Sequence, residues 1–150
     1  AETFRNVNRS NVQTSGIELQ AHWQPLTALS LRSQATYTDI DVGNEDTVLT
    51  GRPQWTANMI ALWQIAEDWH TALDYRYSGQ QWAASLHTGA SVTEELDAYH
   101  RLDWVSRWQL APAWQVQLSV DNVLDEHYET AVGFSAPQRE ARVGVTFSND

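Results

Sequence analysis

The chain contains no cysteine, no lysine and no long apolar run. The absence of cysteine excludes disulfides, thiolate metal ligands and cysteine nucleophiles, so stability must come from strand pairing and packing. All nine basic residues are arginine, a side chain that suits persistent ion pairs with carboxylates. A GC-rich codon bias explains the use of arginine in place of lysine equally well.

Charge and hydropathy narrow the possible classes further. The 150 residues carry a formal net charge of −10 without a basic stripe, so phosphates would be repelled and nucleic acid is excluded as a partner. A membrane-spanning helix needs about 18 consecutive apolar residues, whereas the longest apolar run covers residues 59–63. A strand that crosses a bilayer needs only every second residue to be apolar. The mean hydropathy of −0.48 is therefore compatible with a membrane β-protein.

Apolar and polar residues alternate with a period of two along most of the chain, which indicates β-strands. In residues 71–78, Leu73 and Tyr75 share one face, whereas Asp74 and Arg76 share the other. The predicted strands, about eight in number, cover residues 3–7, 16–23, 29–38, 55–65, 71–78, 100–110, 114–121 and 141–147.

The predicted connections alternate between short and long. Short turns are expected at residues 24–27, 66–68 and 111–113, and long loops at residues 41–52, 83–97 and 129–138. Aromatic residues flank both ends of the strands, with Trp23, Trp63, Trp69, Trp108 and Trp114 beside the turns and Tyr37, Tyr77, Trp82, Tyr99 and Tyr128 near the loops. Tight turns, long loops and two aromatic girdles are typical of up-and-down outer-membrane barrels.

Two soluble folds produce a similar alternation. A β-sandwich also lines one face of each strand with Trp and Tyr, and a lipocalin-like barrel encloses an apolar cavity behind a polar exterior. Aromatic residues at both ends of the apolar face, opposite a highly charged second face, fit two lipid interfaces better. The sequence therefore predicts an all-β fold, an antiparallel up-and-down meander that forms part of a transmembrane β-barrel.

Several motifs occur in a set order along the chain. Gly16-Ile17-Glu18-Leu19 is followed by Gly51-Arg52-Pro53, then by Asn122-Val123-Leu124-Asp125-Glu126-His127-Tyr128, then by Pro137-Gln138-Arg139 and a strand that ends at Phe147. The ordered set resembles the C-terminal part of the barrel of TonB-dependent outer-membrane receptors of the siderophore and cobalamin type. By this resemblance the structural family residues are Gly16, Glu18, Pro53, Asn122, Asp125, Tyr128, Arg139 and Phe147. The chain departs from the family pattern in having Gln138 where glycine is usual, and in the three residues after Phe147.

The resemblance implies that residues 1–150 are a single unit, a piece of a large barrel whose lumen is filled by an N-terminal plug domain that this chain lacks. The whole receptor would lie in the outer membrane of a Gram-negative bacterium, in contact with its lipid. It would import a scarce nutrient, a metal chelate of the ferric siderophore class or cobalamin, with energy supplied through TonB. The alternative is a self-contained eight-stranded barrel with a structural or adhesive role, although residues 3–7 form too short and too polar a strand to close it.

Charged residues on the strands are the first set of candidate site residues. Charge on the lipid face costs about 2–4 kcal/mol near the midplane, so the strand arginines are expected to face the lumen. They are Arg32, Arg76, Arg101, Arg107 and Arg142. Our hypothesis is that they pair with Glu18, Asp74, Asp103 and Asp121 across neighbouring strands and contact the plug.

The predicted loops hold the remaining candidates. Their acidic residues fit either a site for a divalent cation or ordinary solvated loop charge. Asp41, Glu45 and His87 are the candidates for ligand contact because they lie at or in the long loops. No histidine pair has the spacing of a zinc protease, and no serine-nucleophile motif is present. The sequence therefore predicts neither an enzyme nor a bound cofactor.

Overall fold

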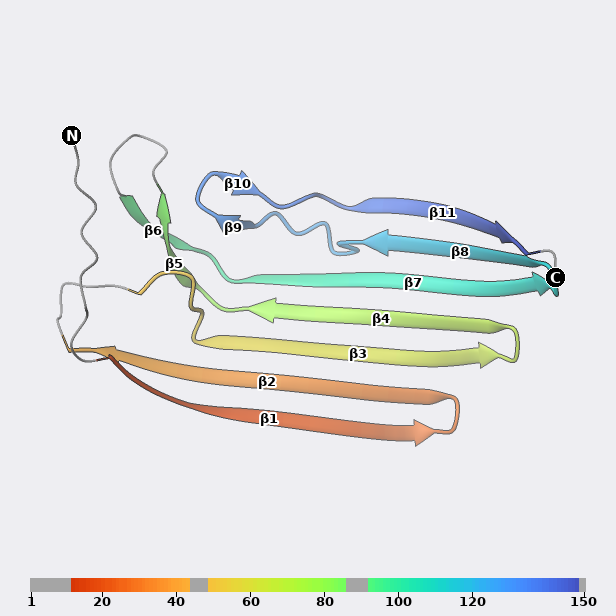
Figure 1. Ribbon diagram of the computed structural model, residues 1–150, viewed down its shortest axis with the longest axis horizontal. Helices are drawn as coiled ribbons and strands as arrows, with labels where there is room; N and C mark the ends of the chain where they lie inside the picture. The colour runs from red at the N-terminus through yellow and green to blue at the C-terminus, as the bar shows by residue number, and fades with distance from the viewer. Residues whose placement is uncertain (1–11, 44–48, 86–91, 149–150) are drawn as a thin grey trace.

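The computed structural model describes residues 12–43, 49–85 and 92–148, and these residues form strands joined by turns and loops. Seven long strands make one sheet with the order β1-β2-β3-β4-β7-β8-β11 (Figure 1). Their bounds are Val12–Leu26 (β1), Leu29–Val42 (β2), Trp55–Ala66 (β3), Trp69–Ser78 (β4), Tyr99–Ala111 (β7), Trp114–Asp121 (β8) and Glu140–Phe147 (β11). Every neighbouring pair is antiparallel. The predicted all-β, up-and-down meander is confirmed.

Four short strands form two hairpins outside this sheet. Gln81–Ser85 (β5) pairs with Val92–Leu96 (β6), and Glu129–Ala131 (β9) pairs with Phe134–Ser135 (β10). Both hairpins lie at the end of the sheet where the long connections gather, and the tight turns gather at the opposite end (Figure 1). We call these the loop end and the turn end. The predicted alternation of short and long connections is confirmed.

The strands differ from the prediction in detail. β1 begins at Val12, and β2 continues to Val42, so residues 41 and 42 belong to a strand rather than to the predicted loop. The predicted loop at residues 83–97 contains most of the β5–β6 hairpin. The predicted strand at residues 3–7 lies outside the described residues. In the described part of the chain, no helix is long and apolar enough to cross a membrane.

The pairing register gives the sheet two unlike faces. On one face Asp74 lies opposite Asp103 and Arg76 lies opposite Arg101, and we call it the polar face. On the other, the apolar face, Leu73 lies opposite Trp104. Because side chains alternate strictly along a strand, a slip of one residue between two strands would mix the two faces.

The sheet is a single layer with little interior. Among the described residues, the buried side chains are Ala83, Leu96, Ser106 and Asn122. Large apolar side chains on the apolar face are open, Leu19 at 66% and Val143 at 72% of full exposure. A soluble sandwich would cover this face with a second sheet, which the described residues do not form. The sheet is also open at β1 and β11, its two edges.

Aromatic side chains occupy both ends of the apolar face. Trp69 stacks on Trp108 near the turn end, with ring centroids 6.1 Å apart, and Tyr37 packs on Trp55 towards the loop end at 4.8 Å. Tyr99 departs from the predicted girdle. It lies opposite Ser78 on the polar face and stacks on Tyr128 at 4.0 Å.

Two hydroxyl groups on the apolar face, of which that of Ser106 is buried, accept hydrogen bonds from tryptophan. The Trp69 Nε1–H donates to Ser106 Oγ at 2.7 Å, and the Trp104 Nε1–H donates to Thr71 Oγ1 at 2.9 Å. An unpaired hydroxyl is costly in an apolar environment. These two bonds allow Ser106 and Thr71 to lie on a face that is otherwise apolar.

Gly16 provides a test of the β1–β2 pairing. A Cβ atom at this position would lie 2.5 Å from the Tyr37 carbonyl oxygen, whereas a Cβ at Gly144 in β11 would meet only ordinary contacts at 3.9 and 4.0 Å. We expect Gly16→Ala to destabilise the sheet by about 1–3 kcal/mol through overpacking, and Gly144→Ala to have little effect. The measurement is the temperature at which the folded, fast-migrating band of the whole receptor is lost on SDS gels. Equal shifts for the two variants would contradict the close approach at Gly16.

Candidate functional site

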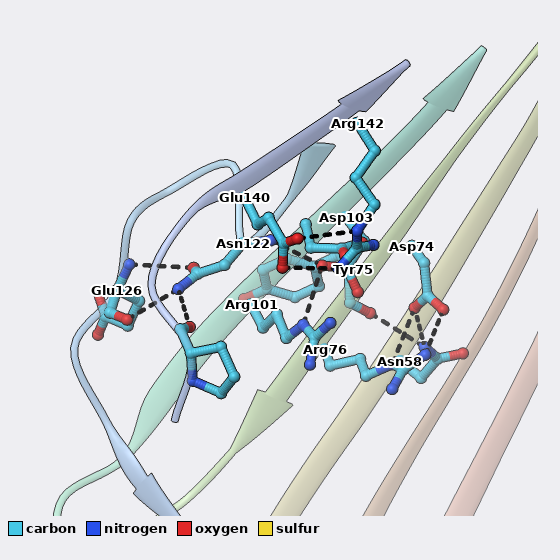
Figure 2. A network of polar contacts seen from close by, with 12 residues as sticks. Asn58, Asp74, Tyr75, Arg76, Arg101, Asp103, Asn122, Glu126, Glu140 and Arg142 are labelled. Atoms are coloured by element: carbon cyan, nitrogen blue, oxygen red, sulfur yellow. Dashed lines mark hydrogen bonds and ion pairs between the residues drawn. The ribbon is translucent and has the colours of Figure 1, made fainter. Parts of the chain in front are cut away.

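Four carboxylates lie in adjacent strands on the polar face, and we call them the carboxylate row: Asp74, Asp103, Asp121 and Glu140. Figure 2 labels three of them, Asp74, Asp103 and Glu140. Asp74 lies opposite Asp103, and Asp121 lies opposite Glu140. Like charges directly opposite each other in a sheet repel. The row is therefore stable only if cations or hydrogen-bond donors surround it.

Arginines compensate most of the negative charge of the carboxylate row. Arg76 Nη2 lies 2.7 Å from Asp74 Oδ2, and Arg101 Nε lies 2.9 Å from Asp103 Oδ1. In each pair the two residues lie two positions apart on the same strand. The hypothesis that these arginines pair across neighbouring strands is therefore wrong for Arg76 and Arg101. The reason is geometric, because residues i and i+2 share a face and the register sets Arg76 opposite Arg101.

Arg142 joins two strands, as the hypothesis requires. Its guanidinium binds Asp121 across the β8–β11 pair and lies 2.7 Å from Glu140 Oε2 on its own strand. One cation thus serves two carboxylates that face each other. Arg142 thus adds side-chain contacts to the backbone pairing of β11 with β8.

Neutral hydrogen-bond donors also contact the carboxylates of the row. The Asn58 side chain donates to Asp74 Oδ1 at 2.8 Å and to the Tyr75 carbonyl at 3.1 Å. The Asn122 backbone N–H donates to Asp103 Oδ1 at 2.8 Å. Asp74 and Asp103 therefore each have a cationic and a neutral partner. The neutral partners join β3 to β4 and β7 to the loop after β8.

The other charged candidates have different partners. Glu18 accepts hydrogen bonds from Gln20 at 2.7 Å and from Gln34 at 2.9 Å, instead of pairing with an arginine as hypothesised. Arg107 Nε donates to Gln117 Oε1 at 2.8 Å. Within the described part of the chain, neither Arg32 nor Arg107 forms an ion pair.

Asn122 organises the loop that follows β8. Its side chain is 2% exposed, and its backbone φ of 51° lies in the left-handed region. The side-chain amide donates to the carbonyls of Glu126 and Pro137 at 3.0 and 3.3 Å, and its oxygen accepts the Glu126 N–H at 3.1 Å. Asparagine tolerates this backbone conformation better than most residues.

Asp125 and Arg139 fasten the same loop to the start of β11. Asp125 also has a positive φ, of 55°, and its Oδ1 accepts the Arg139 backbone N–H at 3.0 Å. Arg139 Nη2 lies 3.5 Å from Asp125 Oδ2. The structure thus brings together Asn122, Asp125, Tyr128 and Arg139, which sequence reasoning identified only as parts of a motif, around one loop that returns the chain to the sheet.

The remaining family residues lie apart from this loop. Pro53 is half-buried in the segment before β3, where the Gly51 N–H donates to the Trp82 carbonyl of β5 at 2.7 Å. Phe147 lies opposite Trp114 at the turn end, with ring centroids 4.8 Å apart. Of the ligand candidates, Asp41 is exposed near the loop end of β2, and Glu45 and His87 lie outside the described residues. Across residues 12–43, 49–85 and 92–148, no three histidine or acidic side chains gather as a metal site.

Sequence reasoning missed the β5–β6 hairpin, which lies at the loop end of the sheet. Ala83 and Leu96 are buried in it, and β9 contacts both of its strands. Together with the hydrogen bond from Gly51 to Trp82, these contacts join the connections between β2 and β3, β4 and β7, and β8 and β11 at the loop end. The adjacent acids Glu94 and Glu95 interrupt the alternation that would have revealed β6.

An antiparallel meander with one apolar face, one charged face, tight turns at one end and long loops at the other is a section of the wall of a membrane β-barrel. Residues 1–123 match the family model described as TonB dependent receptor-like, beta-barrel. The chain belongs to this family.

Known proteins resemble this chain in sequence or in structure. The vitamin B12 transporter BtuB of Vibrio cholerae serotype O1 is 30% identical over 94 residues, which are 63% of this chain and 15% of the transporter. The ferripyoverdine receptor of Pseudomonas aeruginosa superimposes with a TM-score of 0.75 at 17% identity, over 91% of this chain and 19% of that one. The ferric-catecholate import receptor Fiu of E. coli K12 gives 0.75 at 16% identity, over 91% and 21%. The chain thus spans a small part of the length of its relatives.

We expect substitution of Asn122 to destabilise the loop after β8 more than substitution of any of its other residues. We expect Asn122→Ala to cost about 1–3 kcal/mol, because it removes the hydrogen-bond partner of the Glu126 and Pro137 backbone groups and a side chain suited to positive φ. Leu124, which is half exposed, offers a matched control in Leu124→Ala. Limited proteolysis of the folded receptor should show faster cleavage in residues 122–139 for the first variant only. Equal protection of both variants would be inconsistent with the role of Asn122.

Because Asp121 and Glu140 share Arg142, we expect a second substitution to restore part of the heat resistance that is lost with this arginine. Arg142→Gln leaves Asp121 and Glu140 facing each other without a cation, so the heat resistance of the folded receptor should fall. Adding Glu140→Gln removes one of the repelling charges and should restore part of the loss. A double variant that is less heat-resistant than Arg142→Gln alone would show that repulsion in the row is not the cause.

Proposed function

We propose that this chain is the C-terminal section of the barrel wall of an outer-membrane receptor that imports a scarce nutrient by TonB-dependent active transport. The observation that carries the proposal is the two-faced, single-layer sheet of a chain in the TonB-dependent receptor β-barrel family. An apolar face this exposed requires a lipid partner, and a charged face requires water or protein. The proposed location is the outer membrane of a Gram-negative bacterium.

The two ends of the sheet take different roles in this proposal. The turn end faces the periplasm, and the loop end, with the β5–β6 and β9–β10 hairpins, faces the outside. The polar face lines the lumen and contacts the receptor's own plug domain, through which TonB acts. Packing of β9 against β5 and β6 supports a shared surface at the loop end where a ligand is received.

The proposed ligand class is a metal chelate of the siderophore type or cobalamin. The relatives support this range, since one is named as a vitamin B12 transporter, one as a ferripyoverdine receptor and one as a ferric-catecholate import receptor. Asp41, Glu45 and His87 remain the proposed ligand-contact residues of this chain. Asp41 lies near the loop end of β2, and Glu45 and His87 belong to the long loops predicted from the sequence.

Uptake by cells tests the proposal. A Gram-negative host that lacks its own receptors should gain energy-dependent uptake of labelled cobalamin or of a ferric siderophore when it expresses the whole receptor, and should lose that uptake when TonB is deleted. A receptor without the segment containing residues 1–150 is the control for expression and background. Uptake of every tested chelate at background level, or uptake that persists without TonB, would contradict the proposed function.

A further inference from the structure

A hollow of about 340 Å³ opens on the polar face between the carboxylate row and the loop end, and we call it the loop-end hollow. It lies at the outer rim of the sheet, because β3 begins at Trp55 and β7 begins at Tyr99. A ligand that arrives from the loop end therefore meets this part of the wall first. Residues that line the hollow include Gln34, Thr36, Thr56, Asn58, Arg76 and Tyr99.

The register places four hydroxyl-bearing side chains next to one another across four strands. Thr36 of β2 lies opposite Thr56 of β3, and Thr56 lies opposite Ser78 of β4. Ser78 in turn lies opposite Tyr99 of β7. We call these residues the hydroxyl row. Directly opposite residues in a sheet are close neighbours, so the row forms a continuous strip along the hollow.

Most of the hydroxyl row is not used by the wall itself. In the described residues no side-chain hydrogen bond engages Thr36 or Thr56, and the Ser78 hydroxyl makes only a long one, of 3.4 Å, to the Gly79 carbonyl. Thr56 is exposed and Thr36 is half-buried. A hydroxyl group both donates and accepts hydrogen bonds. These side chains can therefore bind either kind of group on a ligand.

Two amide side chains form the next row towards the turns and present their oxygens. Gln34 lies opposite Asn58. The Gln34 Nε2 donates to Glu18 at 2.9 Å, and the Asn58 Nδ2 donates to Asp74 and to the Tyr75 carbonyl. Within the part of the chain that the structure describes, neither amide oxygen accepts a hydrogen bond. An amide oxygen only accepts, so it needs an N–H or O–H group on its partner.

The one charged side chain among the described lining residues is already paired. Arg76 donates to both oxygens of Asp74, at 3.2 Å from Nε and 2.7 Å from Nη2. The depressions at the turn end differ, since Glu67, Asp68, His70 and Arg107 line one of them and Leu62 lines the other. The loop-end hollow thus offers hydrogen bonds with little uncompensated charge.

A fixed aromatic ring borders the hollow on the side of β7. Tyr99 stacks on Tyr128 with ring centroids 4.0 Å apart and an angle of 14° between the rings. Tyr128 belongs to the loop that Asn122 organises. A ring held in this way supplies apolar contact area at a low cost in conformational entropy.

We propose that the loop-end hollow is a subsite for an uncharged part of the imported ligand that carries amide or hydroxyl groups. The N–H or O–H groups of the ligand donate to the oxygens of Gln34 and Asn58, and the hydroxyl row donates to its carbonyl oxygens. An anionic group is disfavoured, because it brings only acceptors to the amide oxygens and finds Arg76 paired with Asp74. This inference rests on the proposed function and favours an amide-bearing ligand such as cobalamin over an anionic ferric catecholate.

Equilibrium binding to the purified whole receptor tests the subsite, with cyanocobalamin and a ferric tris-catecholate as probes. Thr36→Val combined with Thr56→Val removes two hydroxyl groups and keeps side chains that are branched at Cβ, as strands favour. We expect the affinity for cyanocobalamin to fall about tenfold, as the loss of two hydrogen bonds implies. Thr146→Val, the same substitution opposite Gln115 near the turn end, should leave the affinity unchanged.

The outcomes separate the subsite from the proposed function. If cyanocobalamin binds equally well to the wild-type receptor and to the folded double variant, the hollow is not a subsite and the proposed function stands. If the receptor binds and imports the catecholate but not cyanocobalamin, the preference for uncharged groups is wrong and import stands. Absence of binding and of TonB-dependent uptake for every chelate tested would contradict the proposed function itself.

A charge variant tests the selection against anions. Asp74→Asn releases Arg76 from its ion pair, so that an uncompensated guanidinium borders the hollow. The ratio of the affinity for the catecholate to the affinity for cyanocobalamin should then rise several-fold, because a charge-assisted hydrogen bond becomes available to the anion. An unchanged ratio, in a variant whose heat resistance shows it to be folded, would overturn the role of the Arg76–Asp74 pair in selection.

Discussion

The register of strand pairing is the constraint on which the rest of this structure depends. Each of the six antiparallel pairs in the sheet must align so that apolar residues meet apolar residues and charged residues meet charged residues. A wall within lipid has no water to satisfy unpaired backbone groups, so the ladders must also be continuous. The close approach at Gly16 and the bonds from tryptophan to Ser106 and Thr71 are local consequences of keeping that register.

The polar face then divides into two regions with different chemistry. Around the carboxylate row, arginines and Asn58 compensate the acids within the wall, and Arg142 extends this compensation to the last strand. Towards the turns, an apolar floor and an arginine without a carboxylate partner in the described residues remain open. The first region joins neighbouring strands through side-chain contacts, and the second is a shallow depression in the same face. The loop after β8, organised by Asn122, joins the first region to the surface at the loop end.

Much of the fold follows from period-two alternation, which is why the seven long strands and the three tight turns could be predicted from sequence. Alternation assigns a face to each side chain but not its partner, so it could not show that Arg76 and Arg101 pair along their own strands or that Glu18 binds glutamines. It also fails where strands are short and acidic, as at Glu94 and Glu95. The stacking of Tyr99 on Tyr128 depends on how the Asn122 loop returns, which no local pattern reveals.

A nitroxide scan along residues 71–76 of β4 tests the two-faced wall most directly. Single cysteines are placed in a cysteine-free background of the whole receptor, and the accessibility of each label to oxygen and to a water-soluble relaxation agent is measured in outer membranes. The account predicts a period of two, with labels at Leu73 and Tyr75 relaxed by oxygen in lipid, and labels at Ala72, Asp74 and Arg76 shielded from lipid. Accessibility without that alternation would contradict the assignment of one face to lipid and the other to the lumen.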